Sequence, residues 1–81
     1  MINKFSDGTP ITPYLASAYA ECFCEGEGAS QLDQIRAWCF LIGTKLVYQL
    51  QGWYGRQAQN LIEQGIVSPS GDLLVDEEMF I

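Results

Sequence analysis

The sequence predicts a mainly α-helical fold in which three helices are arranged around a long central helix, with a small C-terminal β-hairpin. Three segments repeat hydrophobic residues at helical spacing, and residues typical of helix ends flank them. Near the C-terminus, the turn sequence Ser68–Gly71 separates two short apolar runs, which favours a hairpin. A chain of 81 residues accommodates one domain, so residues 1–81 are expected to form a single small, acidic, helical domain.

The first helix is expected to begin at Thr12 and Pro13. Thr12 is a good N-cap residue, and Pro13 suits the first helical position because its missing N–H would be unpaired there. Residues 1–10 contain a turn signal and are expected to form either a short strand and turn or an ordered arm. Gly26 and Gly28 are expected to end the helix. Its apolar face consists of Leu15, Ala18, Tyr19 and Cys22.

The central helix is expected to span about residues 31–51, with Ser30 as its N-cap. It is hydrophobic nearly all round, which indicates either the centre of a bundle or a contact with another chain. Gly43 lies inside it and favours close approach of another backbone, although a break near Gly43 is the alternative. One apolar stripe comprises Leu32, Ile35, Trp38, Cys39, Ile42, Leu46 and Leu50, and a nearly opposite stripe comprises Ala37, Leu41 and Tyr48.

The third helix is shorter and has one apolar and one polar face. Gly65 is expected to follow its C-terminus, with Ile66 folding back over the last turn. The apolar face consists of Tyr54, Ala58, Leu61 and Ile62. The polar face consists of Arg56, Gln59, Asn60 and Glu63.

The charge balance argues against direct binding of nucleic acid. Ten acidic and four basic residues give a net charge of −6, whereas binding a phosphate backbone requires Lys and Arg to displace counterions. Lys4, Arg36, Lys45 and Arg56 are too few and too scattered for this purpose. Acidity of this degree indicates either simple solubility or attraction to basic surfaces.

Three cysteines and the complete lack of histidine limit the chemistry of the chain. An odd cysteine count without a signal-like N-terminus predicts that the protein resides in the reducing cytoplasm. No apolar run approaches the ~20 residues that a membrane span needs. Cys22 and Cys24 would point about 200° apart on a helix, so with Cys39 they are expected to be structural thiols. Histidine is the commonest general base and zinc ligand. We therefore expect no enzymatic activity, no metal and no cofactor.

Two acidic groups are candidate interaction residues. Glu21, Glu25 and Glu27 gather at the end of the first helix, where acids oppose the helix dipole. This unfavourable placement indicates either a functional acidic patch or a solvated helix end. The second group follows the predicted hairpin and consists of Asp76, Glu77 and Glu78.

Adjacent aromatic residues and the second apolar stripe suggest further contacts. Trp53 and Tyr54 stand between glycines, which is typical of a packed corner or of an interface anchor. In a regular element they point in different directions, so one is expected in the core and the other at the surface. Ala37, Leu41 and Tyr48 are difficult for so small a monomer to cover, so a homo-oligomer, most simply a dimer, is expected to use them as its interface.

The segment Arg56–Ser68 resembles the recognition helix and following turn of winged-helix DNA-binding domains. Its matching residues are Ala58, Leu61-Ile62-Glu63 and Gly65-Ile66-Val67-Ser68, and the turn at Ser68–Gly71 would stand for the wing. The match covers about twenty residues. Because only Arg56 could contact a base or phosphate and the wing is acidic, the resemblance implies topology without DNA binding.

Taken together, these features predict a non-enzymatic protein–protein interaction module. Its expected partner is a larger protein or protein–nucleic-acid complex with a basic surface, and its expected location is the cytoplasm. In size and charge the chain is similar to small inhibitors encoded by phages and mobile elements, including anti-CRISPR proteins. The alternatives are a small winged-helix-like transcription regulator and a structural subunit of a homo-oligomer.

Overall fold

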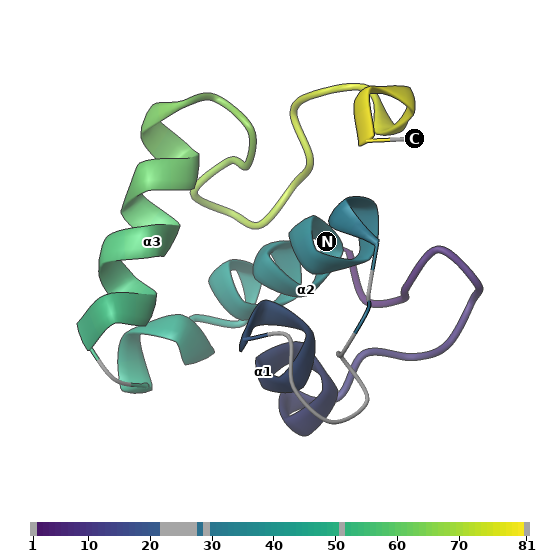
Figure 1. Cartoon of the computed structure of the whole chain (residues 1–81). Helices are drawn as coiled ribbons and strands as arrows, with labels where there is room; N and C mark the ends of the chain where they lie inside the picture. Colours follow the sequence, from purple (N-terminus) through teal and green to yellow (C-terminus); the bar gives the residue numbers. More distant parts are fainter. Residues whose placement is uncertain (1, 22–27, 29, 51, 81) are drawn as a thin grey trace.

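The computed structural model describes residues 2–21, 28, 30–50 and 52–80, and these ranges contain three α-helices and two short 3₁₀ helices. Figure 1 shows α2 in the middle, with α1 packed against it, α3 on one side and the N-terminal arm on the other. The predicted mainly helical fold with three helices is confirmed. The elements are α1 (Pro13–Glu21), α2 (Gln31–Gly43), η2 (Leu46–Gln49), α3 (Gly52–Glu63) and η3 (Glu77–Phe80).

The start of α1 forms as the sequence predicts. The hydroxyl of Thr12 accepts a hydrogen bond from the N–H of Leu15 at 3.2 Å, which satisfies one of the unpaired donors of the first turn. Before it, the N-terminal arm turns at Gly8, whose φ is +89°. The arm places Phe5 in the core, where its ring stacks on Tyr19 with centroids 4.0 Å apart.

The predicted central helix over residues 31–51 is wrong in length. α2 starts as expected, with the Ser30 hydroxyl accepting the Asp33 N–H at 3.2 Å, but it ends at Gly43. The Thr44 hydroxyl donates to a carbonyl four residues earlier at 2.8 Å, and Lys45 adopts a left-handed conformation with φ +65°. Glycine propagates a helix poorly and a threonine hydroxyl competes for helical carbonyls, so the chain leaves the α-helix here.

A close backbone contact lies at the same point. Gly71 is buried with φ +91°, and a Cβ atom placed on it would lie 2.5 Å from the Cα of Gly43 and 2.6 Å from the carbonyl oxygen of Cys39. The turn over residues 68–71 therefore rests directly on the last turn of α2. The expectation that Gly43 permits close approach of another backbone is confirmed.

The end of α3 also forms as predicted. Gly65 has φ +73° and donates its N–H to the Ile62 carbonyl at 3.1 Å. The N–H of Ile66 reaches the Leu61 carbonyl at 3.1 Å. These two bonds form the Schellman motif, which satisfies carbonyls left unpaired at the helix end.

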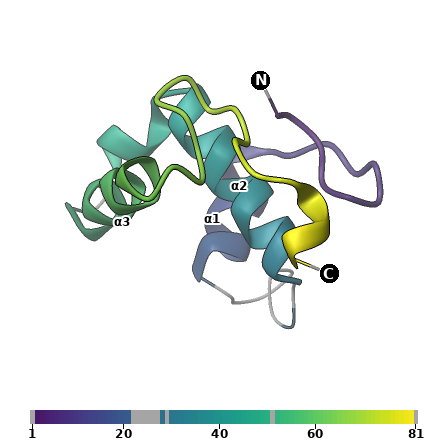
Figure 2. The ribbon, with the colours of Figure 1, turned by 90° about the horizontal axis from the view of Figure 1, so that it is seen from above.

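The predicted C-terminal β-hairpin is wrong, because the described residues contain no β-strand. Val67 and Leu73 form only an isolated antiparallel bridge. The turn between them is held on α2 through Gly71, and the following residues are drawn toward α2 by Glu77. These contacts direct the chain away from Val67, so the strand pairing does not extend beyond the one bridge to Leu73. Figure 2 shows η3 and the N-terminal arm on the same side of α2, away from α3.

Both apolar stripes of α2 are covered within this one chain. Ala37 and Leu41, from the second stripe, have no exposed surface, while Tyr48 lies in η2 and is 56% exposed. Of the two interpretations of its all-round hydrophobicity, the structure favours the centre of a bundle. The buried residues of α2 are Leu32, Ile35, Ala37, Trp38, Cys39, Leu41 and Ile42.

Candidate functional site

Glu21, in the first predicted acidic group, joins two helices. Its carboxylate accepts a hydrogen bond from the Tyr54 hydroxyl, which links the end of α1 to α3. Tyr54 is only 4% exposed, and burial, with the bond to Glu21 as a second cause, raises the pKa of Tyr54 to about 12. Glu25 and Glu27 lie outside the described residues. Of this predicted group, the described part therefore connects α1 to α3 through one hydrogen bond.

Of the predicted aromatic pair, Tyr54 lies in the core and Trp53 packs at its edge. Tyr54 packs with Trp38, with ring centroids 5.7 Å apart, and belongs to the core. Trp53 is half-buried, stacks obliquely on Tyr54 at 4.2 Å and meets Trp38 edge-on at 6.1 Å. The two rings lie against one another, so the expectation that they point in different directions is wrong. Trp53 is thus a rigidly supported aromatic ring with part of its surface exposed.

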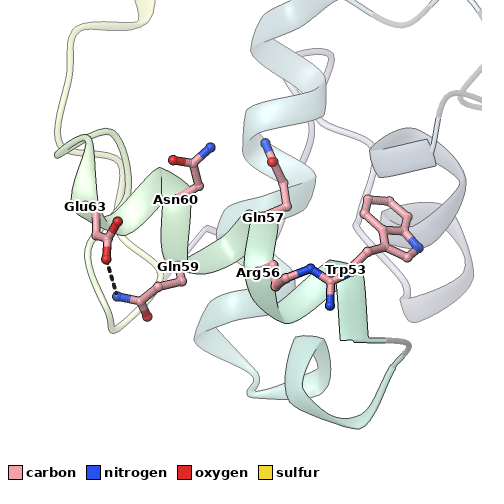
Figure 3. A pocket seen from close by; sticks show the side chains of 6 residues that line it. All are labelled: Trp53, Arg56, Gln57, Gln59, Asn60 and Glu63. Atoms are coloured by element: carbon pink, nitrogen blue, oxygen red, sulfur yellow. Dashed lines mark hydrogen bonds between the residues drawn. The ribbon is translucent and has the colours of Figure 1, made fainter.

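The outward face of α3 is the first candidate interaction surface. It surrounds an open hollow of about 520 Å³, with Trp53 at one end and Glu63 at the other (Figure 3). The Gln59 amide donates to the Glu63 carboxylate at 3.4 Å. Sequence periodicity identifies the polar face itself, but not the hollow between its side chains. The lining residues are Trp53, Arg56, Gln57, Gln59, Asn60 and Glu63.

The second candidate surface is the C-terminal acidic segment, which we define as residues 72–79. Two large apolar side chains in it are exposed: Leu74 at 57% and Met79 at 70%. They are interspersed with carboxylates that are exposed as well. The exposed acids are Asp72, Asp76, Glu77 and Glu78.

Arg36 fixes the C-terminal acidic segment and the N-terminal arm to α2. Its guanidinium forms an ion pair with Glu77 and also donates to the carbonyl of Lys4 at 2.7 Å. One turn earlier, Asp33 accepts the N–H of Ser6 at 2.8 Å. Sequence reasoning did not assign Arg36 a role. Its signal is the single cation of a mainly apolar helix.

The remaining predicted residues are at scattered positions. Cys39 is fully buried, and this burial raises the pKa of its thiol to about 12, so it is an unreactive core residue. Cys22 and Cys24 lie outside the described residues.

The predicted oligomer residues do not form one surface, because Ala37 and Leu41 are internal and Tyr48 is exposed. Among the described residues, no helix has the length and apolar character that crossing a membrane requires.

Comparison with known proteins places the chain in one family. The family model described as Domain of unknown function (DUF7417) matches residues 26–81. This range includes α2, η2, α3 and η3, and therefore both candidate surfaces. No curated protein and no solved structure matches the chain.

Proposed function

We propose that this chain, which belongs to the family described as Domain of unknown function (DUF7417), is a non-enzymatic protein-interaction module that binds a basic surface on a larger partner. The observation that carries the proposal is the composition of the C-terminal acidic segment. Leu74 and Met79 are exposed there beside Asp76 and Glu78. Exposed apolar side chains bordered by charged ones are typical of protein-binding surfaces.

The two kinds of side chain have different parts in this binding. Asp76 and Glu78 attract a basic partner over distance, together with the chain's net charge of −6, and so raise the rate of encounter. Leu74 and Met79 then lose water on contact and slow the dissociation of the complex. Methionine is well suited to this contact because its flexible thioether adapts to irregular surfaces.

The segment is also held in a defined conformation before it meets a partner. The Arg36–Glu77 ion pair fixes η3 on α2, and Gly71 docks the preceding turn on Gly43. Ordering a flexible segment at the moment of binding would reduce affinity. A segment already ordered by the fold avoids that cost, which supports a binding role.

The specific form we propose is an inhibitor of a nucleic-acid-handling protein or complex. Such proteins present basic grooves to phosphate backbones, and an acidic protein seated in the groove would exclude the nucleic acid. Small inhibitors encoded by phages and mobile elements, including anti-CRISPR proteins, have a similar size and charge. The proposed site of action is accordingly the cytoplasm of a host cell.

Affinity purification with matched variants tests this function. The full chain is the bait, in parallel with the variants Met79→Ala and Asp76→Asn/Glu78→Gln and with the control Asp7→Asn. Asp7 is an exposed acid of the N-terminal arm, and asparagine can retain its hydrogen bond from Thr9. We expect one basic partner to be retained by the chain and the control but depleted about tenfold by the other two variants. Equal recovery with all four baits would contradict the proposal.

A DNA-binding regulator is the second candidate, favoured by the side chains on α3. Arg56 lies on the exposed face of α3 and can pair with guanine. The turn at Ser68–Gly71 follows α3 in the chain order of a winged-helix domain, but Val67 and Leu73 form only an isolated bridge beside it. A mobility shift of duplex DNA at low salt that Arg56→Ala abolishes would support this candidate. The net charge of −6 opposes it, so we expect no shift.

A further inference from the structure

The outward face of α3 has a charge pattern that is complementary to itself. Arg56 lies in the first half of α3 and Glu63 is its last residue. Seven residues, or about two helical turns, separate them, which corresponds to about 10 Å along the axis. The side chains between them on this face are neutral amides: Gln57, Gln59 and Asn60.

The guanidinium of Arg56 has no ion-pair partner within the part of the chain that the structure describes, and Glu63 receives only the 3.4 Å bond from Gln59. Both charged groups are therefore available to a partner. Trp53 adds a half-buried aromatic ring at the end of the same face. Tryptophan and arginine are the residues most enriched in the energetic centres of protein interfaces.

We infer that the outward face of α3 binds a second copy of this chain, with the two α3 helices antiparallel across a two-fold axis. In that arrangement Arg56 of each copy meets Glu63 of the other, so the same attraction is made twice. A parallel arrangement would instead place Arg56 beside Arg56 and Glu63 beside Glu63. The antiparallel dimer is the one that the charges select.

The amides suit the centre of such an interface. Gln59 and Asn60 lie midway between Arg56 and Glu63 and therefore next to the two-fold axis. A side-chain amide carries both donors and acceptors, so it can pair with its own symmetry mate. The face requires no second type of partner to satisfy its hydrogen-bonding groups.

The distribution of charge over the whole chain also favours this face. Two copies that each carry −6 repel one another, and acids meeting acids would add to that repulsion. The outward face of α3 holds one cation and one anion and is neutral overall. It is also separate from the C-terminal acidic segment, which the dimer leaves available for the proposed partner. Ala37 and Leu41, which the sequence predicts at the interface of a homo-oligomer, are internal. The inferred dimer therefore uses the outward face of α3 as its interface.

Charge reversal tests this dimer. Sedimentation equilibrium of the full chain, at low salt and from micromolar to millimolar concentration, should show a monomer–dimer equilibrium. Arg56→Glu should raise the dissociation constant by at least about tenfold, since it turns two attractions into two repulsions. The control Lys4→Glu makes the same change in net charge at an exposed site in the N-terminal arm and should have a smaller effect.

Mixing variants gives the sharpest result. Arg56→Glu presents two acids on the face and Glu63→Arg presents two bases, so each should be mainly monomeric alone and the two should associate when mixed. The double variant R56E/E63R should recover the original dissociation constant to within about threefold. Circular dichroism would confirm that these exposed substitutions leave the helices intact. A monomer at all concentrations, equal effects of Arg56→Glu and Lys4→Glu, or no association in the mixture would overturn the inference.

Discussion

The C-terminal acidic segment and α3 both present side chains to a partner, but they are fixed in place by different kinds of contact. α3 is held by its own hydrogen bonds, by a Schellman motif at Gly65 and by one buried apolar face. The C-terminal acidic segment has little regular structure and depends on Gly71 and on the Arg36–Glu77 ion pair. A helix therefore carries its own support, whereas an irregular segment takes its support from residues distant in the sequence.

The largest expected effect comes from Gly71→Ala, which removes the support of the C-terminal acidic segment. The new Cβ would collide with the backbone of α2 at Gly43, and φ +91° is unfavourable for alanine. We expect the free energy of unfolding to fall by about 2–4 kcal/mol, as measured by chemical denaturation.

Gly55→Ala is the matched control within α3. No atom lies within 4 Å of a Cβ at Gly55, and alanine is the better helix former. This variant should be more stable than the parent by about 0.5–1 kcal/mol. If both substitutions had the same effect, the close contact between Gly71 and Gly43 would not contribute to stability.

Arg36→Met should have the next largest effect. Methionine retains most of the apolar length of arginine but loses the ion pair with Glu77 and the hydrogen bond to the Lys4 carbonyl. We expect a loss of about 1–3 kcal/mol. Hydrogen exchange should quicken at Met79, whose N–H bonds to Asp76 within the segment, while the amides of α3 keep their protection. If the amides of α3 lost as much protection as that of Met79, Arg36 would support the whole fold and not the N-terminal arm and the C-terminal acidic segment in particular.

A smaller effect is expected from alkaline pH, and it concerns the connection between α1 and α3. Burial raises the pKa of Tyr54 to about 12 from its ordinary value of 10.0, so folding favours the neutral hydroxyl. The contribution to stability is complete below pH 10 and is lost as the pH rises from 10 to 12, by an amount on the order of 1–2 kcal/mol.

The variant Tyr54→Phe isolates this contribution. Cys39 titrates in the same range, because its thiol pKa is raised to about 12, but it is present in both proteins and its effect cancels in the difference. The free energy of unfolding should decline less between pH 10 and pH 12 in Tyr54→Phe than in the parent. Parallel pH profiles would contradict the assigned role of the Tyr54 hydroxyl.

The parts of the fold that the sequence predicts correctly are those that depend on neighbouring residues. The caps at Thr12 and Ser30, the motif at Gly65 and the buried face of α3 all arise from residues a few positions apart. The sequence also indicates that Gly43 would permit a close contact, but not that Gly71 would provide it.

The errors concern competition between local and distant contacts. α2 stops at Gly43 because Thr44 bonds back to the helix and the turn at Gly71 docks there, although the apolar pattern continues beyond it. The hairpin fails because contacts with α2 outweigh strand pairing. The roles of Glu21 and Glu77 also depend on distant partners, Tyr54 and Arg36, so their acidic clusters alone could not reveal them.

Binding kinetics with the partner recovered by affinity purification test the central claim most directly. At low salt, Asp76→Asn/Glu78→Gln should slow association and weaken its dependence on salt, because these carboxylates steer the encounter. Met79→Ala should instead increase the dissociation rate. Asp7→Asn should leave the dissociation rate unchanged and should slow association less than the Asp76→Asn/Glu78→Gln variant does. If the amide variant and Met79→Ala bound with the kinetics of the parent chain, the C-terminal acidic segment would not be the binding surface.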